Sequence, residues 1–440
     1  MNAAATAQET AAAAAAVGTA MRPRVAILLG SPFTEQNVER LGLHYLAPHL
    51  DIHVIDCARL IGRNPDAIAA QRAHWPHYEA VCTAEELRQA LRSCGAAWAI
   101  DNIGFDVDTA WVGDVVQALG VGIVSVKSGL LPLPSLKDRL RAFLMRPGEA
   151  AVPPPPDSAL PQPAQAGRSP LTRAASLWRK VANRAVYEWR RRNCIPDPDL
   201  VLLAGSDALE ASDSKMAAAK IWVGSEDFYK FQTVAAQLAA DESAQRQRPF
   251  ALFVDVCLPH ATDWKFLGMA PPIMVEEYYP LLCRLFDRVE RLLGMPVVVA
   301  GHPNTRWVPD YAALVGGREL VLGHTAALVM QADLVLTHAS TATSFIALAT
   351  IPSVFVSSHS IDRTYYGSRV RAMAESLSSP LVMLEDADRL TRDDLPSAAD
   401  AAACRRYVVR YLRSSEATEI EPWQGLIEFL TRHPSGPLNR

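Results

Sequence analysis

The sequence lacks several short patterns that mark large enzyme classes. No G-x-G-x-x-G follows any strand-like run, and neither a Walker phosphate loop nor a G-x-S-x-G turn occurs. The first absence argues against a nicotinamide or flavin cofactor, and the other two against a P-loop nucleotidase and an α/β-hydrolase. Asp-x-Asp occurs three times, at 106/108, 197/199 and 386/388. Because repeated isolated pairs are weak signals of a divalent-ion site, we expect no catalytic metal.

Cysteine pairs, excess charge and long apolar runs are also missing. The seven cysteines are dispersed without C-x-x-C or metal spacing, as in reduced thiols of a cytosolic protein. A net charge of −4 argues against nucleic-acid binding by the chain as a whole. No apolar run reaches the ~20 residues of a membrane span. Residues 1–20 lack a basic start and place Glu9 before an alanine tract, so we expect a disordered or weakly helical tail and a cytoplasmic protein.

The first half of the chain alternates strand-like and helix-like segments. After the run at 24–30, residues 34–50 have helical spacing with Thr34 as a plausible N-cap. Further strand-like runs lie at 51–57, 96–104, 121–129, 199–205 and 219–225. This order predicts a parallel sheet, and we expect one Rossmann-like domain over 21–238.

Two unusual segments interrupt this domain. Residues 148–170 are so rich in proline that we expect a loop or linker. Residues 171–192 predict a basic amphipathic helix, since eight Lys or Arg between 168 and 192 face one acid, Glu188. The simpler interpretation is a helix packed on the domain with solvated arginines. The other is attachment to an anionic membrane surface on its cytoplasmic face.

The second half repeats the alternation. Strand-like runs lie at 250–257, 295–301, 317–323, 332–338 and 351–358, with helical segments between them. We expect a second Rossmann-like domain over 248–397 and C-terminal helices over 398–440. The predicted fold class is therefore α/β, with two Rossmann-like domains facing a cleft.

Polar residues follow three strands of the second domain. Asp255 closes the first run, Gly301-His302-Pro303 ends "VVVAGHPNTRW", and "THASTATSF" follows the run at 332–338. Because the carboxyl ends of parallel strands share one edge, all three sets are expected at one crevice. Taken alone, Ser340-Thr341 is more often a helix cap, and His302 a structural hydrogen-bonder. Their co-occurrence favours a phosphate pocket formed by adjacent strands, with these candidate donor-binding residues: Gly301, His302, Pro303, Asn304, Arg306, His324, Thr325, Thr337, Ser340 and Thr341.

The pair "AGHPNTR" and "THASTATSF" resembles the HP and Ser/Thr motifs of bacterial GT-B glycosyltransferases. That group includes sialyltransferases, polysialyltransferases and capsule Kdo transferases, and its donors are CMP-activated sugar acids. The resemblance implies that the domain over 21–238 binds the acceptor and the domain over 248–397 binds the donor. In addition, it implies that His302, Ser340 and Thr341 contact the donor phosphate. It also implies that no cofactor is needed, because the nucleotide sugar is a substrate. A UDP donor stays open, with Arg306 or Arg363 serving its second phosphate.

The catalytic base is less defined by the sequence. The resembled sialyltransferases use an acidic residue of the first domain, where "IDNIGFD" offers Asp101 and Asp106 without matching the motif. Asp255 of the second domain competes with them.

The leading hypothesis is a transferase that builds a cell-surface glycan on a glycan or lipid-linked acceptor. A UDP-sugar-dependent transferase, a nucleotide-sugar epimerase and a polyol-phosphate transferase are rivals on the same fold. A non-catalytic nucleotide-binding protein is the rival from another class.

Overall fold

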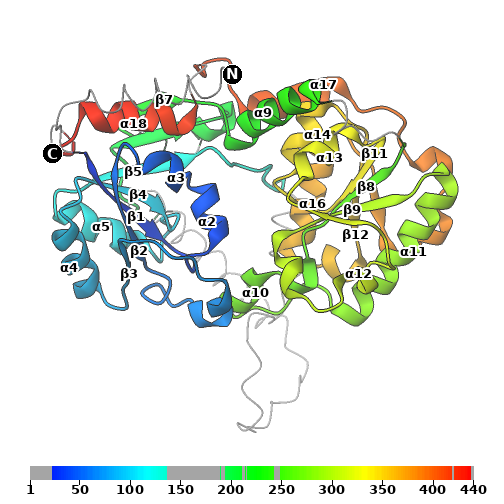
Figure 1. Cartoon of the computed structure of the whole chain (residues 1–440), viewed down its shortest axis with the longest axis horizontal. Coiled ribbons are helices and arrows are strands. Elements are labelled where there is room, and N and C mark those ends of the chain that lie inside the picture. The colour runs from blue at the N-terminus through cyan, green and yellow to red at the C-terminus, as the bar shows by residue number, and fades with distance from the viewer. Residues whose placement is uncertain are drawn as a thin grey trace, which may run out of the picture.

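The computed structural model describes residues 22–135, 189, 194–210, 214, 216–241, 248–418 and 421–437. The Pro-rich segment 148–170 lies outside these residues, as do the tail 1–20 and the basic segment 171–192 apart from Trp189. Two α/β units lie side by side, each built on a parallel sheet (Figure 1). The prediction of two Rossmann-like domains with C-terminal helices is confirmed.

The N-terminal sheet has seven strands in the order β3-β2-β1-β4-β5-β6-β7, all parallel. Six of them match the predicted runs, and all of these except β7 contain a buried apolar stretch. The strands are β1 (Arg24–Leu29), β2 (Asp51–Asp56), β3 (Tyr78–Ala80), β4 (Trp98–Asn102), β5 (Gly122–Lys127), β6 (Leu200–Leu203) and β7 (Ala219–Trp222). The helices are α2 (Glu35–Arg40), α3 (Leu43–Leu46), η1 (Pro65–Gln71), α4 (Ala84–Cys94), α5 (Ala110–Ala118) and η2 (Ser206–Glu210).

The predicted helix over 34–50 is two helices. Thr34 is the N-cap of α2, as expected, and forms a capping box with Asn37. Gly42 then adopts a left-handed φ of 58° and starts α3. Glycine tolerates this conformation without a steric penalty, so the helix breaks there.

The C-terminal sheet has six parallel strands in the order β10-β9-β8-β11-β12-β13. They are β8 (Ala251–Val254), β9 (Val297–Gly301), β10 (Leu320–Leu322), β11 (Leu334–Thr337), β12 (Ser353–Ser357) and β13 (Leu381–Met383). The helices of this domain are η4 (Leu258–His260), α10 (Thr262–Phe266), α11 (Val275–Leu293), η5 (Pro303–Trp307), α12 (Tyr311–Leu314), α13 (Thr325–Gln331), α14 (Thr343–Ala349), α15 (His359–Asp362), α16 (Tyr365–Ser376), η6 (Leu384–Arg389), η7 (Arg392–Asp394), α17 (Ala401–Tyr407) and the π-helix η8 (Val408–Leu412).

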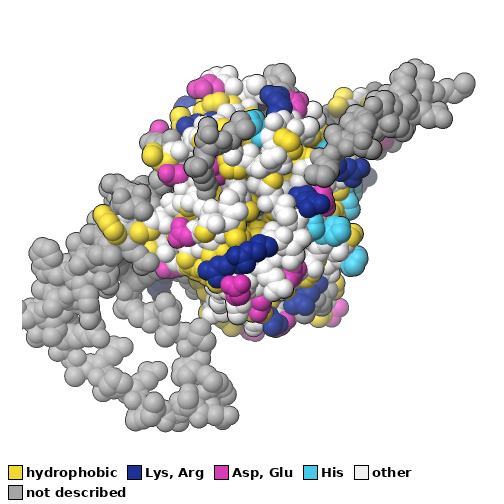
Figure 2. All heavy atoms as spheres, turned by 90° about the vertical axis from the view of Figure 1, so that its left-hand side faces the viewer, with side chains coloured by type: hydrophobic (Ala, Val, Ile, Leu, Met, Phe, Trp, Pro, Cys, Tyr) yellow, Lys and Arg dark blue, Asp and Glu magenta, His cyan; other side chains and the backbone are white. Residues whose placement is uncertain are grey.

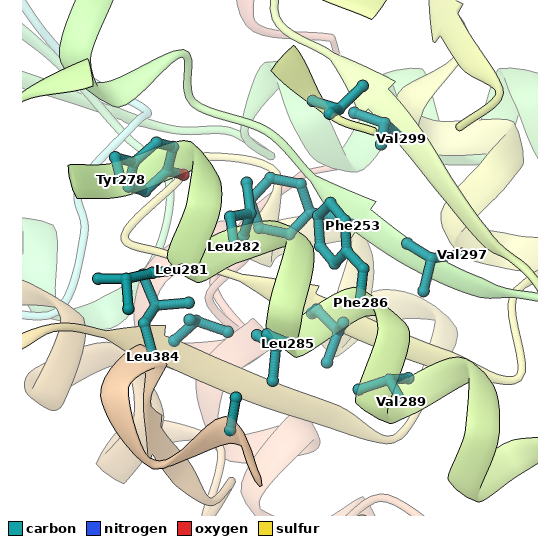
Figure 3. Close-up of a cluster of buried hydrophobic side chains, with 14 of the residues drawn as sticks. Phe253, Tyr278, Leu281, Leu282, Leu285, Phe286, Val289, Val297, Val299 and Leu384 are labelled. Carbon is teal, nitrogen blue, oxygen red and sulfur yellow. The ribbon is translucent and has the colours of Figure 1, made fainter. Parts of the chain in front are cut away.

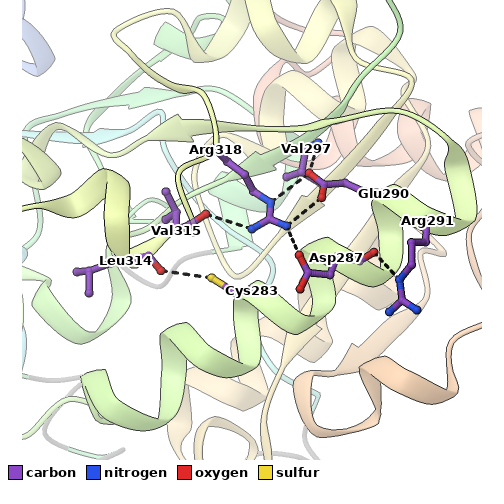
Figure 4. A network of polar contacts seen from close by, with 8 residues as sticks. All are labelled: Cys283, Asp287, Glu290, Arg291, Val297, Leu314, Val315 and Arg318. Carbon is purple, nitrogen blue, oxygen red and sulfur yellow. Dashed lines mark hydrogen bonds and ion pairs between the residues drawn. The ribbon is translucent and has the colours of Figure 1, made fainter.

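Helix α11 covers one face of this sheet and holds β9 in place. Its apolar side chains pack on Phe253 and the strands in one buried cluster, with the Phe253 and Phe286 rings 5.1 Å apart (Figure 3). Arg318 forms ion pairs with Asp287 and Glu290 of α11, at 2.5 and 2.9 Å (Figure 4). Glu290 also accepts the backbone N–H of Val297 at 3.0 Å. The start of β9 is therefore tied to α11 by both packing and charge.

The chain crosses between the domains twice. Helix α9 (Glu226–Ala240) follows β7 but packs Phe231 and Val234 against the core of the C-terminal domain. Helix α18 (Pro422–Arg432) returns and buries Trp423, Leu426 and Leu430 in the core of the N-terminal domain. The predicted boundaries at 238 and 398 follow chain order, whereas the packing exchanges these two helices between the domains.

The described surface has mixed charge. Acidic and basic side chains are interspersed on the face of the N-terminal domain drawn in Figure 2. Within the described ranges, none of the helices has both the length and the apolar character that crossing a membrane requires.

Candidate functional site

Each sheet has one topological switch point, where the connections that follow two neighbouring strands run toward opposite edges of the sheet. In the C-terminal sheet it lies between β8 and β11, and in the N-terminal sheet between β1 and β4. Ligands of open α/β sheets bind outside the carboxyl ends of the strands at such points. Both carboxyl edges meet at the domain junction, where the N–H of Asn64 donates to the carbonyl of Phe266 at 3.0 Å. The fold therefore brings two candidate binding edges together.

His302 follows β9 and caps the short helix η5. Its Nδ1 accepts the backbone N–H of Asn304 at 3.1 Å, so the neutral ring carries its proton on Nε2. Burial lowers the pKa of His302, which favours this neutral form. Thr305 Oγ1 donates to the His302 carbonyl at 2.8 Å, and Asn304 reaches Thr262 at 3.2 Å. Within the described residues no partner occupies Nε2, so the ring presents one aimed donor.

Pro303 is exposed beside this ring, and Gly301 is buried beneath it. A Cβ on Gly301 would lie 2.7 Å from both Leu320 and Leu322, so glycine is needed there for strand packing rather than for ligand contact.

Asp255, predicted as a catalytic carboxylate, lies beneath the His302 loop with 4% of its surface exposed. It accepts hydrogen bonds from the Tyr311 hydroxyl at 2.6 Å, the Cys257 N–H at 2.7 Å and the backbone N–H of His302. Burial raises its pKa, and these hydrogen bonds oppose the rise. The geometry makes Asp255 a brace for the loop, and a proton-transfer role stays a prediction.

The loop after β11 divides into an inner and an outer part. Thr337 is fully buried and its hydroxyl donates to the carbonyls of Val254 and His338, so this predicted donor-binding residue has no surface for a ligand. Ser340 is half-buried and its Oγ accepts the Ala342 N–H at 3.2 Å. Thr341 is exposed. Helix α14 begins at Thr343.

His338 belongs to the quoted THASTATSF motif but was not among the predicted donor-binding residues, and it connects the elements around the site. Its Nδ1 donates to the Val356 carbonyl at 2.6 Å, and its Nε2 accepts the Tyr278 hydroxyl at 2.8 Å. Burial lowers the pKa of His338 to about 4. The neutral ring therefore joins β11, β12 and α11.

The sequence placed His302 and Ser340 on adjacent strands, which is wrong. Strand β8 lies between β9 and β11, so two strand spacings separate the two loops. At ~4.8 Å per spacing this is about 10 Å at the sheet edge. His324 and Thr325 lie beyond His302, at the end of the edge strand β10, with His324 exposed.

The sequence analysis did not point to Arg369 of α16, whose charge acts on Tyr366 beside the loop after β11. Tyr366 of α16 donates to the Ala339 carbonyl at 2.9 Å. Burial raises the pKa of Tyr366, and the nearby Arg369 guanidinium lowers it. No carboxylate of the described residues pairs with Arg369. The expected cations are placed less favourably, since Arg306 is exposed and donates to the Pro303 carbonyl, and Arg363 is exposed after α15.

Asp101 and Asp106 serve the backbone of one loop. Asp101 accepts the N–H groups of residues 103–105 at 2.9 to 3.1 Å. Asp106 accepts those of Asp108 and Thr109 at 2.9 and 3.0 Å. Burial raises the pKa of Asp101. Both carboxylates shape the loop after β4, and their predicted catalytic roles stay predictions.

No cluster of three or more His, Cys, Asp or Glu suited to a metal ion occurs among the described side chains. A shallow hollow of about 400 Å³ on α17 and η8 is lined by arginine and apolar side chains. It contains none of the predicted site residues.

No family model and no curated protein sequence matches the chain. Its fold is similar to that of the UDP-GlcNAc 2-epimerase of Methanocaldococcus jannaschii, with 11% identity, a TM-score of 0.45 and coverage of 93% of this chain and 99% of that one. The glycosyltransferase of kitacinnamycin has 12% identity, a TM-score of 0.45 and coverage of 94% and 99%. MurG of Acinetobacter baumannii has 11% identity, a TM-score of 0.40, and coverage of 93% of this chain and 99% of that one. Because each TM-score is below 0.5, none of these similarities bears on the site.

Proposed function

We propose that this protein is a glycosyltransferase that uses a nucleotide sugar, with the donor bound at the carboxyl edge of the C-terminal sheet. One observation carries the proposal: His302 presents an aimed Nε2–H beside the β8/β11 switch point, at a junction where a second sheet edge faces it. When the bond between sugar and phosphate breaks, negative charge grows on the leaving group. Fixed hydrogen-bond donors stabilise such charge most where they need no rearrangement.

Within this proposal the donor is a nucleoside diphosphate sugar. The His302 and Ser340 loops are about 10 Å apart at the sheet edge, so a diphosphate can meet both with one phosphate each. Arg369 supplies positive charge near Tyr366, whose hydroxyl donates to the carbonyl of Ala339, the residue before Ser340. The CMP donor favoured by the sequence has one phosphate and takes second place. The glycan or lipid-linked acceptor then approaches from the N-terminal domain, and a cytoplasmic, membrane-peripheral location remains part of the proposal.

The test combines binding and turnover. Thermal shift with UDP, CDP and CMP identifies the nucleotide, and mass spectrometry with UDP- and CMP-sugars detects donor turnover. His302→Ala should reduce transfer by about 100-fold, the usual effect of removing one oxyanion donor. Ser340→Ala should weaken UDP binding. His49→Ala and Ser93→Ala, exposed positions before β2 and β4, are the controls.

A larger rise in melting temperature with CMP than with UDP would favour the CMP-sugar donor predicted from the sequence. Sugar turnover without any acceptor would favour the epimerase alternative. Binding without turnover would favour the non-catalytic one, and no response to any nucleotide would overturn the proposal.

A further inference from the structure

The N-terminal sheet has its own switch point, and none of the predicted residues for binding the nucleotide-sugar donor lies there. The chain leaves β1 toward β2 and β3, then returns to β4 on the other side of β1. The ends of β1 and β4 are neighbours, since the N–H of Gly30 donates to the Asn102 carbonyl at 3.4 Å. A crevice at this place is the expected ligand position for the N-terminal domain.

Two arginines converge on these strand ends. Arg63, from the loop after β2, donates from its guanidinium to the Gly30 carbonyl. Arg40, the last residue of α2, donates to Asn102 Oδ1 at 3.5 Å. A Cβ on Gly30 would come within 2.7 Å of Arg63 Nη1, so the guanidinium lies directly over the strand end.

The positive charge at this point is only partly balanced. No ion pair joins Arg40 or Arg63 to a carboxylate in the described part of the chain. Burial lowers the pKa of Arg63, and only the more distant Asp106 and Asp263 oppose this. Asp263, across the junction on α10, has its own pKa raised by burial and lowered by both arginines. Three described carboxylates, Asp106, Asp263 and Glu226, therefore act on the two arginines, but each does so from beyond ion-pair distance.

A hydrogen-bond donor is also unsatisfied here. Asn102 Nδ2 is buried and has no partner, while Oδ1 of the same amide is taken by Arg40. Leaving a buried donor unpaired is unfavourable, so an oxygen at this position would be stabilised.

We propose that Arg40 and Arg63 form an anion subsite at the β1/β4 switch point, which holds a phosphate or carboxylate group of the acceptor substrate. The guanidinium fork suits such oxyanions better than any neutral sugar hydroxyl. The assignment to the acceptor rests on the proposed function, because the donor occupies the facing edge. The class of acceptor is thereby narrowed to a glycan or lipid-linked glycan that carries an anionic group.

The experiment measures inorganic phosphate binding to the full chain by ³¹P NMR at constant ionic strength. Arg40→Gln, at an exposed position, should weaken phosphate binding about 5-fold or more, as expected for a charge-assisted hydrogen bond. Arg63→Lys, which keeps the charge and removes the fork, should weaken it as well. Asp263→Asn should strengthen it, because the competing carboxylate is gone. Arg88→Gln, an exposed arginine of α4 paired with Glu85, should change nothing.

Unchanged phosphate binding in both arginine variants would overturn the inference. Weaker phosphate binding in Asp263→Asn would overturn it as well, because the arginines would then serve to contact Asp263 across the domain junction. UDP thermal shift on the same samples separates the two proposals. A normal UDP shift with arginine-independent phosphate binding removes only the acceptor subsite. Arginine-dependent phosphate binding without any UDP shift removes only the donor assignment.

Discussion

The two histidines of the C-terminal domain differ in what surrounds Nε2. In His302 the backbone occupies Nδ1 and Nε2 has no partner among the described residues. In His338 both nitrogens are bonded inside the core, to Val356 and Tyr278. Only Nε2 of His302 is available to a ligand, although both histidines follow strands and both lie within the quoted motifs. A sequence gives the residue type at a strand end, whereas the partner of each nitrogen depends on distant segments such as α11.

His338 should make stability fall in mild acid. Its pKa is lowered from 6.5 to about 4 by burial, so the unfolded chain binds the proton more readily. The stabilising contribution is therefore complete above pH 6.5 and is lost as the pH falls toward 4. Between pH 7.5 and pH 5 this single ring should cost wild type about 2 kcal/mol. Urea denaturation of wild type and His338→Gln at both pH values measures the difference.

The exposed His49→Gln serves as the control and should keep the wild-type pH dependence. If His338→Gln loses as much stability between the two pH values as wild type does, the ring is not the group that titrates.

The strands show which elements a sequence can predict. Eleven predicted runs became strands, and nine of these strands contain a buried apolar stretch, the exceptions being β7 and β10. The two missed strands, β3 and β13, have three residues each and no buried residue, which they share with the predicted strand β10. The order of β9, β8 and β11 was also missed, because chain order does not reveal which strand lies in the middle. Arg63 could have been noticed as a cation following a strand, whereas Arg369 lies inside a helix and gives no local sign.

Helix α18 should matter to the domain on which it packs, not to the domain that precedes it in the chain. Trp423 is 6% exposed in the core of the N-terminal domain. Trp423→Ala should therefore lower the free energy of unfolding by about 3–5 kcal/mol, the usual cost of removing a buried tryptophan. Hydrogen exchange followed by mass spectrometry should show lost protection in β1, β2 and β4.

Trp111→Ala is the matched control, since this tryptophan of α5 is 37% exposed and should cost much less. Lost protection confined to the strands of the C-terminal domain would contradict the assignment of α18.

At the scale of the whole molecule, the two segments that cross between the domains, one before α9 and one after η8, run side by side. The N–H of Ser225, which caps α9, donates to the Leu412 carbonyl at 2.7 Å, and that of Ser414 donates to Ala204 at 2.9 Å. The Arg413 guanidinium lies 5.1 Å from the Phe228 ring centre. Any relative movement of the two sheet edges must bend these segments. The charge gathered beside them therefore bears on both the stability and the mobility of the junction.

Glu226, in the first turn of α9, should make this junction less stable as the pH rises. Burial, followed by the charges of Asp227 and Glu421, raises its pKa to about 7, against the opposing charges of Arg40 and Lys230. The stabilising contribution of the protonated carboxyl is complete below its ordinary pKa of 4.5 and is lost as the pH rises through about 7. Glu226→Gln keeps the shape without the charge. Allowing for partial exposure to solvent, it should stabilise the protein by about 1–2 kcal/mol at pH 8 and by little at pH 4.5.

Denaturant unfolding at both pH values measures this free-energy difference. Glu276→Gln, which changes an exposed first-turn glutamate of α11, is the control and should leave both values unchanged. Equal effects of Glu226→Gln at the two pH values would show that its carboxyl does not titrate in this window, and the junction would then owe its charge balance to Asp227 and Glu421 alone.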